Sequence, residues 1–271
     1  MLKKFFVLVI MDLLVMSSQI ATAEDYDWNQ APRIAGKADL ACYIESERRK
    51  GQTEIHFILT NFKLSANGET VEEELDGLLD EYINTFAMAP GVRLSGIRGT
   101  GQLILKITKE YPGTRVANAY LSSNTSKLTA EEKQIYHLAV SIVDEANKFS
   151  SEVEKARYIH DEICRIVKEY KSHTNEDAIG AILFKVTNCQ GYADAFYMIG
   201  RMSGLNVSRI GGSLRKGVGH VWNTITFSNG KTYCVDVTLD DKYNTHDYFL
   251  APFEVMKRYH SCEWELLPNL Q

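Results

Sequence analysis

Apolar residues in the C-terminal half of the chain recur first at helical spacing and then, beyond Gly204, at alternate positions. Thr129 with Glu132, and Ser151 with Glu154, have the spacing of helix-capping side chains, so each pair predicts the start of a helix. The positions that we expect these two helices to bury are Ile135, Leu138, Ala139, Ile142, Val143, Ala146, Ala156, Ile159, Ile163, Val167 and Tyr170.

A third helix is predicted to begin at Cys189, and alternating segments follow it. These segments are "NVSRIGGSL" (206–214), "GHVWNTITF" (219–227), "KTYCVDVT" (231–238) and "HDYFLAP" (246–252). Helices followed by strands in this order indicate an α+β domain, in which helices pack on an antiparallel sheet.

The N-terminal part of the chain has a different pattern, which predicts a small α/β domain. A strand at 54–62, a helix at 71–86 and a strand at 101–111 read as a β-α-β unit, with Leu103, Leu105 and Ile107 on one strand face. The polar, turn-rich stretch 121–129 then predicts a boundary, so we expect an accessory domain at 24–122 and a second domain at 123–271. The glycine-rich run "GIRGTG" (96–101) lacks the strand and helix that nucleotide binding would require.

The first 23 residues resemble a secretory signal peptide. Lys3 and Lys4 precede an apolar run at 5–16, and Ala21 to Ala23 supply the small residues of a cleavage site. Cleavage after Ala23 would place the protein outside the cell, at its surface or in the periplasm. An uncleaved N-terminal anchor is the alternative, and no later segment is apolar enough to span a membrane.

Composition excludes several functional classes. The net charge of -5 becomes -6 when the signal, with two lysines and one aspartate, is removed, and no basic run suggests nucleic-acid binding. The odd number of cysteines leaves at least one thiol unpaired within the chain, and no C-x-x-C spacing supports a zinc ribbon or a redox motif. The five are Cys42, Cys164, Cys189, Cys234 and Cys262.

Cys189 is the first candidate for chemistry. Asn188 is a good N-cap residue, so the thiol would lie in the first helical turn, where backbone N–H groups and the helix dipole stabilise a thiolate. A structural cysteine packed under the sheet is the alternative when the helix is considered alone.

The strands after the helix contain a histidine and an aspartate that can meet. A three-residue loop at Ser228 to Gly230 would place Trp222 opposite Asp236 and His220 opposite Thr238. His220 and Asp236 would then be diagonal neighbours on one face of the sheet, within reach of a hydrogen bond. A two-residue turn would shift the register by one and send Asp236 to the other face.

Three blocks around these residues resemble signature motifs of the bacterial transglutaminase-like superfamily, relatives of the papain-like cysteine enzymes. The blocks are "NCQGYADAF" (188–196), "GHVWN" (219–223) and "YCVDVTLDD" (233–241), and the resemblance covers roughly 128–267. It implies a papain-like, transglutaminase-core fold for the C-terminal domain. It also implies Cys189 as nucleophile, His220 as base and acid, and Asp236 as the group that orients His220.

The resemblance implies an enzyme that works without a cofactor on a protein or peptide, with cell-wall peptide as one option. Acyl transfer and hydrolysis of peptide or isopeptide amides both remain open, as does a non-catalytic cell-surface binding module with the same fold. The candidate substrate-binding residues are Gln190, Tyr192, Trp222 and Tyr248, although capping by Gln190 and core packing by Trp222 are alternatives.

Other titratable side chains give weaker signals. His160 and Cys164 share a helix face near Asp161 and Glu162, but no further ligand is evident, so we expect core packing rather than a metal site. Cys234 could pair with Cys262 or fill space behind the sheet. The histidines for which the sequence shows no partner are His56, His137, His173, His246 and His260.

Overall fold

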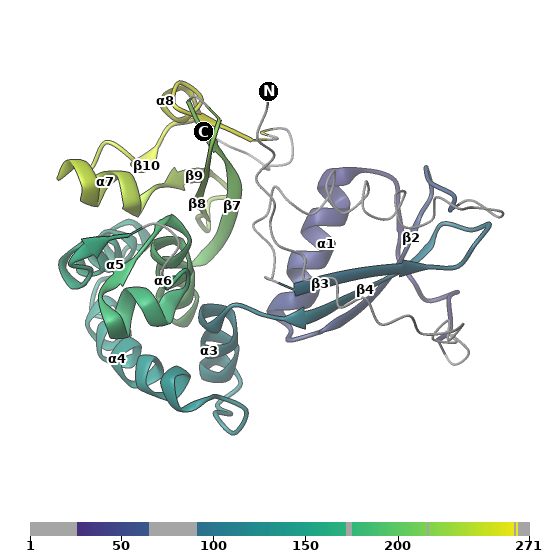
Figure 1. The fold of residues 1–271 in the computed structure, drawn as a ribbon, viewed down its shortest axis with the longest axis horizontal. Helices are drawn as coiled ribbons and strands as arrows, with labels where there is room; N and C mark the ends of the chain where they lie inside the picture. The colour runs from purple at the N-terminus through teal and green to yellow at the C-terminus, as the bar shows by residue number, and fades with distance from the viewer. Residues whose placement is uncertain (1–25, 65–90, 172–174, 216, 263, 265–271) are drawn as a thin grey trace.

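The computed structural model describes residues 26–64, 91–171, 175–215, 217–262 and 264, which form two lobes (Figure 1). The N-terminal lobe is a four-stranded sheet in the order β1-β2-β4-β3 with one helix, α1, against it. Its elements are β1 (Arg33–Ile34), α1 (Lys37–Arg49), β2 (Glu54–Leu59), β3 (Gly91–Gly96) and β4 (Gln102–Lys109). No described helix has both the length and the hydropathy needed to cross a bilayer.

The two strands predicted in this lobe exist as β2 and β4, and they are neighbours. They pair antiparallel, with Ile55 opposite Leu105 and Phe57 opposite Leu103, and all four side chains are buried. The helix predicted at 71–86 lies outside the described residues, so the β-α-β order stays a prediction. The α1 helix, which the sequence pattern did not indicate, packs Ile44 into the same apolar cluster.

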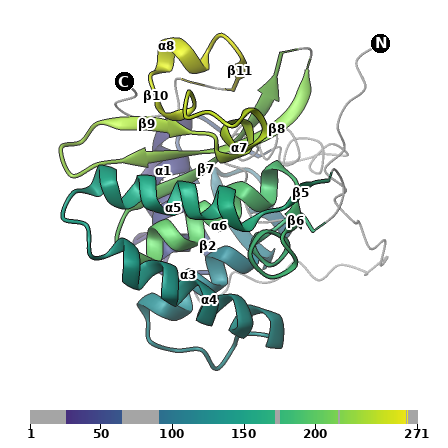
Figure 2. The ribbon, with the colours of Figure 1, turned by 90° about the vertical axis from the view of Figure 1, so that its left-hand side faces the viewer.

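The C-terminal lobe has the predicted α+β architecture. Four helices pack together beside a five-stranded sheet of order β10-β9-β8-β7-β11 (Figure 2). Every neighbouring pair of strands in this sheet is antiparallel. The helices are α3 (Pro112–Leu121), α4 (Ala130–Ala146), α5 (Glu152–Ile166) and α6 (Cys189–Met202), and the strands are β7 (Asn206–Leu214), β8 (Val218–Thr226), β9 (Thr232–Val235), β10 (Phe249–Ala251) and β11 (His260–Ser261).

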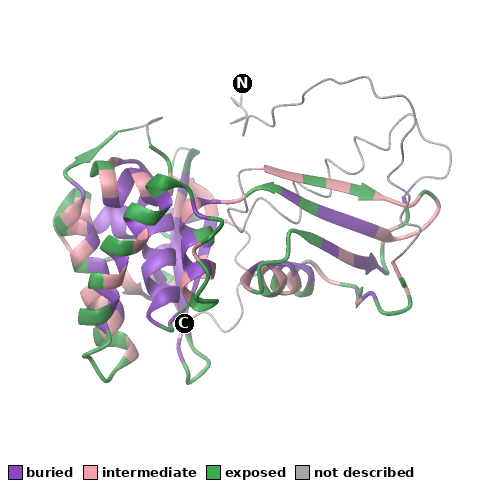
Figure 3. Cartoon of the chain, turned by 90° about the horizontal axis from the view of Figure 1, so that it is seen from below, coloured by how far each residue is buried: buried purple, intermediate pink, exposed green. Residues whose placement is uncertain are grey.

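Short elements complete this lobe. They are β5 (Glu169–Tyr170), η2 (Gly180–Phe184), β6 (Val186–Thr187), α7 (Val237–Tyr243) and α8 (Phe253–Met256). The α6 helix is the centre of the lobe, because nearly all of its residues are buried between the other helices and the sheet (Figure 3). A helix this deeply enclosed holds its first residue, Cys189, in a fixed position.

The capping predictions are confirmed. The Thr129 hydroxyl accepts from the Glu132 N–H and the Glu132 carboxylate accepts from the Thr129 N–H, which completes the capping box of α4. The Ser151 hydroxyl caps α5 by accepting from the Glu154 N–H. Leu138 is a correction, because its side chain is 47% exposed rather than buried on α4.

A second correction concerns the end of α5. The helix stops at Ile166. Val167 is buried as expected, but Tyr170 does not belong to the buried face of this helix. Tyr170 belongs to β5 instead and is 50% exposed, because β5 pairs in parallel with β6 at the surface. This change of element brings Tyr170 next to the start of α6.

The predicted boundary at 122–123 separates α3 from the core in which it packs. Val116 and Ala117 of α3 lie in the same apolar cluster as Phe196 of α6, and the Arg201 guanidinium donates to the Asn118 side chain at 3.0 Å. We therefore propose a boundary close to Glu110, between β4 and α3.

A buried carboxylate ties α3 to α6 and the sheet. Asp194 accepts from the backbone N–H groups of Gly113 and Ala178, both at 3.0 Å, and pairs with the Arg209 guanidinium. A Cβ at position 113 would lie 2.4 Å from the Asp194 carboxylate, which explains the glycine. Burial raises the pKa of Asp194 and the charge on Arg209 opposes that rise.

Candidate active site

Cys189 is the first residue of α6, as the sequence predicts. Asn188 has extended backbone angles and its side-chain oxygen accepts from the N–H groups of Gln190 at 3.0 Å and Gly191 at 3.4 Å. Any Cβ at Gly191 would lie 1.8 Å from the Thr187 hydroxyl, so only glycine lets the strand β6 approach this closely. The Cys189 side chain is 9% exposed, at the positive end of the helix dipole.

The β8–β9 hairpin has the predicted three-residue loop. The Phe227 N–H donates to the Lys231 carbonyl at 3.0 Å, and Thr226 pairs with Thr232. Gly230 has φ of 80°, the left-handed conformation that such a loop requires. The alternative two-residue turn is therefore excluded, and the register continues to Asn223 opposite Val235, immediately before Asp236.

This register brings His220 and Asp236 into contact. His220 Nε2 lies 2.7 Å from Asp236 Oδ2, and both side chains are buried. Burial would lower the pKa of His220, but the charge and hydrogen bond of Asp236, with further contributions from the Cys189 side chain, raise it. Because Nε2 is engaged by Asp236, Nδ1 is the ring nitrogen left for the Cys189 thiol.

Asp236 also ends the strand. Its Oδ1 accepts from the Leu239 N–H at 3.1 Å, which makes Asp236 the N-cap of α7. The strand predicted to continue to Thr238 therefore stops at Val235, and the expected pairing of Thr238 with His220 is wrong. The capping hydrogen bond of Asp236 starts a helix where the alternating pattern predicted more strand.

A second histidine, His260, bonds the same carboxylate. Its Nε2 lies 2.8 Å from Asp236 Oδ2, and its side chain is 3% exposed. Burial would raise the pKa of Asp236, but the charges and hydrogen bonds of His220 and His260 lower it. The sequence shows no partner for His260, because β11 reaches this position only through its pairing with β7.

Tyr170 is a second residue, after His260, whose place near the candidate site the sequence did not indicate. Its register partner is Thr187, two residues before Cys189, and the Lys171 N–H donates to the Thr187 carbonyl at 2.8 Å. Burial raises the pKa of Tyr170, and the charge of Cys189 adds to the rise. The hydroxyl therefore lies within electrostatic range of the candidate nucleophile.

The four candidate substrate-binding residues differ in their surroundings. Trp222 and Tyr192 are both almost fully buried, and the Tyr192 hydroxyl bonds Asp241. Trp222 lies nearly parallel to the His220 ring at 6.1 Å, which suits a shielding role. Gln190 lies 3.4 Å from the Tyr111 hydroxyl, and Tyr248 is partly exposed, 5.8 Å from the His260 ring. Gln190 and Tyr248 are thus the more accessible of the four.

Cys234 is a free thiol buried behind the sheet, so of its two alternatives it fills space. Burial raises the pKa of the Cys234 thiol to about 12. The indole N–H of Trp222 has no hydrogen-bond partner among the described residues.

Two clusters in the described part of the chain contain enough donor atoms for a metal ion: His220, Asp236 and His260, and a second group of His160, Asp161 and His246. In the first, both histidines already bond Asp236. In the second, both histidines bond Asp161 Oδ1, at 2.8 and 2.9 Å. In this structure both clusters are hydrogen-bond networks.

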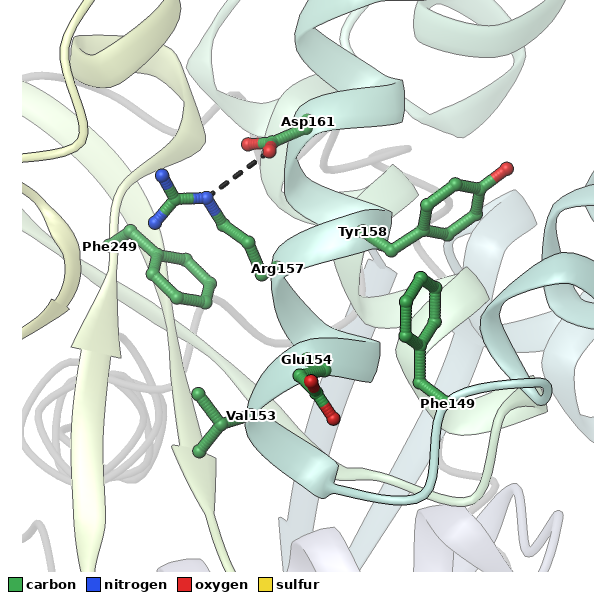
Figure 4. A pocket seen from close by; sticks show the side chains of 7 residues that line it. All are labelled: Phe149, Val153, Glu154, Arg157, Tyr158, Asp161 and Phe249. Atoms are coloured by element: carbon green, nitrogen blue, oxygen red, sulfur yellow. Dashed lines mark hydrogen bonds and ion pairs between the residues drawn. The ribbon is translucent and has the colours of Figure 1, made fainter.

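A positively charged side chain, Arg157, lies beside the second cluster. Arg157 Nε lies 3.1 Å from Asp161 Oδ2, and the two line a cavity of about 370 Å³ on α5 (Figure 4). Glu154 and four apolar or aromatic side chains form the rest of that wall, with Phe249 stacked under the Arg157 guanidinium at 4.9 Å. Cys189, His220 and Asp236 do not line this cavity.

Part of this chain is similar to known proteins. Residues 137–237 match the family model of the Transglutaminase-like superfamily, and no curated protein matches the chain. A solved TGase is 16% identical over 77% of this chain and 59% of its own, with a TM-score of 0.37. The periplasmic domain of TgpA from Pseudomonas aeruginosa bound to ethylmercury is 11% identical over 56% of this chain and 61% of its own, with a TM-score of 0.35.

The chain therefore spans about three fifths of the length of these two solved structures. The family match includes the helix start, the hairpin and the aspartate that the three sequence blocks contain. Residues 137–237 are thus transglutaminase-like, as the sequence motifs indicated.

Proposed function

We propose that this chain is an exported thiol enzyme that attacks peptide or isopeptide amides with Cys189, His220 and Asp236. The observation that carries the proposal is the 2.7 Å contact between His220 Nε2 and Asp236 Oδ2, together with the interaction of His220 with the Cys189 side chain at a helix N-terminus. A buried His–Asp pair beside a thiol at a helix start is an arrangement that activates a nucleophile.

The roles follow from the atoms. The Cys189 thiolate attacks the amide carbon, and the oxyanion that develops is stabilised by the backbone N–H of Cys189 at the start of α6. His220 donates a proton from Nδ1 to the leaving amine, which leaves an acyl group on Cys189. An amine or a water molecule, deprotonated by His220, then attacks the thioester and regenerates the thiol.

Asp236 keeps His220 usable in both steps. Its charge stabilises the imidazolium, and its bond to Nε2 leaves Nδ1 facing the thiol. Gln190, Tyr248 and Tyr170 are the side chains that we propose for substrate contact, because they lie beside the thiol or the His–Asp pair with some exposure. Trp222 and Tyr192 support the site from within the core.

Export and domain roles belong to this proposal as well. Export is supported by the basic and apolar pattern of residues 1–23, which precede the described part of the chain. A protein or peptide outside the cytoplasm, such as a cell-wall peptide, would then be the substrate. We propose that the N-terminal lobe is an accessory domain. It is anchored to the catalytic lobe through Arg49, whose guanidinium donates to the Val207 carbonyl at 2.8 Å.

The decisive experiment offers the purified protein two reactions at once. It is incubated with a fluorescent primary amine and a glutamine-rich protein, and peptide release is measured in parallel. Amine incorporation identifies a transferase and peptide release identifies a protease, and both must vanish in Cys189→Ala. A folded wild-type protein that performs neither reaction on a panel of peptides would instead favour the binding-module alternative.

We expect brief iodoacetamide treatment at pH 6 to label Cys189 selectively. Burial raises the pKa of Cys42, of Cys164 and of Cys234, so these thiols stay protonated and slow to react. Peptide mapping after the reaction gives the position of the label. Preferential labelling of Cys42, Cys164, Cys234 or Cys262 would contradict the assignment.

Turnover should hold constant through mildly alkaline pH and fall as the pH rises through about 10, the raised pKa of His220. Only the protonated ring can donate to the leaving amine, so activity follows the imidazolium. The same sign applies to folding: the His220–Asp236 interaction stabilises the protein fully below about pH 6.5, and its contribution is lost as the pH passes the raised value. Measuring kcat between pH 7 and 11, with circular dichroism at each pH, separates the two effects, and a fall centred near 6.5 would contradict the proposed pairing.

A further inference from the structure

The Asp236 carboxylate receives three hydrogen bonds, one more than a Cys–His–Asp arrangement with a helix cap requires. Leu239 N–H donates to Oδ1, and Oδ2 receives both His220 Nε2 at 2.7 Å and His260 Nε2 at 2.8 Å. The two histidines therefore meet on one oxygen atom, with their ring centres 5.7 Å apart.

His260 is held so that only its Nε2 can reach Asp236. Its Nδ1 lies 3.3 Å from the Met256 carbonyl, while the Trp222 and Tyr248 rings contact it edge-on at 4.9 and 5.8 Å. The register of β11 with β7, His260 opposite Leu214, fixes the backbone. Because an ionised carboxylate only accepts, the Nε2–H of His260 is the donor in this bond.

Such an arrangement fixes the carboxylate plane. Without His260, Asp236 would be held by Leu239 at one oxygen and by His220, the group it has to orient, at the other. With His260 in place, the position of Oδ2 is determined independently of His220. The His220 ring must then align with a fixed acceptor, which aims Nδ1 at Cys189.

We propose that His260 is a positioning residue, a second histidine that fixes Asp236 and through it the His220 ring. This inference rests on the proposed triad function, and it adds a fourth side chain to that machinery. The competing explanation is that His260 only anchors β11 to the sheet.

The charged groups around His260 leave Asp236 as its acidic partner. The titratable and charged groups that face it are Asp236 and His220 on the inner side and the cationic wall of a cavity of about 450 Å³ on the outer side. The charged residues of that cavity wall are Arg215, Lys257 and Arg258. Among the described residues that line this cavity there is no carboxylate, and Asp236 is the acidic group that His260 bonds.

The experiment compares His260→Leu, which removes the donor, with His260→Gln, which keeps an N–H near the position of Nε2. His246→Leu is the matched control, because His246 bonds a different carboxylate, Asp161, at a similar 2.9 Å and lies outside the triad. Three readouts are measured on the full chain: the rate of Cys189 alkylation at pH 6, the ¹⁵N-histidine NMR signals of the His220 ring, and kcat and KM.

We expect His260→Leu to shift the His220 signals and to lower both the alkylation rate and kcat by up to about 10²-fold, since a misplacement of ~1 Å can cost that much. KM should stay close to the wild-type value. His260→Gln should restore most of the lost rate and the His220 signals, and His246→Leu should change neither.

The inference is overturned if folded His260→Leu keeps wild-type alkylation and unchanged His220 signals. It is equally overturned if Gln and Leu lower the melting temperature and the alkylation rate alike, because that pattern describes an anchor. If Leu prevents folding, His260→Phe replaces it, since a ring can remain between Trp222 and Tyr248. Absence of amide turnover in the wild type would defeat the proposed function alone, and alkylation and NMR would still decide the role of His260.

Discussion

Cys189→Ala is expected to abolish nearly all turnover, a loss on the order of 10⁶-fold in kcat if the residues act as one catalytic unit. Alanine leaves no nucleophile, while the helix start is preserved because the capping oxygen belongs to Asn188 and accepts from the N–H groups of Gln190 and Gly191. Single-turnover kinetics on a substrate found by the paired assay, together with a melting curve, measures both effects.

His220→Ala should be nearly as damaging, and the double variant hardly worse than either single change. The thiol cannot be deprotonated, nor the leaving amine protonated, without the ring, so removing the second group takes away little that remains. Cys234→Ala is the matched control for the loss of a buried thiol that does not meet His220. Substantial turnover by folded Cys189→Ala would overturn the thiol mechanism.

Asp236→Asn is expected to lower kcat by about 10²- to 10⁴-fold, less than loss of the thiol or the imidazole. Asparagine is a good N-cap, so α7 should persist, but the amide lacks the charge that stabilises imidazolium. The pKa of His220 should then fall toward its ordinary value, so the alkaline limit of activity moves to lower pH. The pH dependence of kcat for both proteins measures this shift.

Asp236→Asn should also be less stable than the wild type, by roughly 1 to 3 kcal/mol. Three N–H groups converge on the carboxylate, and an amide can accept at only one of its two atoms. Asp161→Asn is the matched control, because Asp161 also accepts from two histidines but lies outside the triad. An unchanged alkaline limit in Asp236→Asn would show that Asp236 does not govern the His220 ring.

Local sequence was sufficient wherever a short segment determines its own geometry. The N-cap at Asn188, the capping box of Thr129 and the left-handed Gly230 each depend on bonds within a few residues. Gly230 fixes the loop and therefore the register of both strands. The register decides whether Asp236 lies on the same face of the sheet as His220. The contact between His220 and Asp236 was therefore predictable from sequence.

Other parts of the site depend on elements that are distant in the chain. The approach of Tyr170 to Cys189 needs β5 to leave the helical pattern and pair with β6, and α3 joins the C-terminal core by packing on α6. No periodicity or residue spacing in the sequence indicates the β5–β6 pairing or the packing of α3 on α6. Both contacts depend on the whole fold rather than on the local segment.

The sequence by itself indicated the proposed nucleophile, base and carboxylate, since each lies on a helix start or a hairpin whose geometry is local. Only the tertiary structure decided what holds that carboxylate in place. His260 follows Asp236 by 24 residues and reaches it through β11, at the far edge of the sheet from β9. Burial of Asp236 opposes its ionisation, but the charges and hydrogen bonds of the two histidines keep the carboxylate ionised and hold it in place.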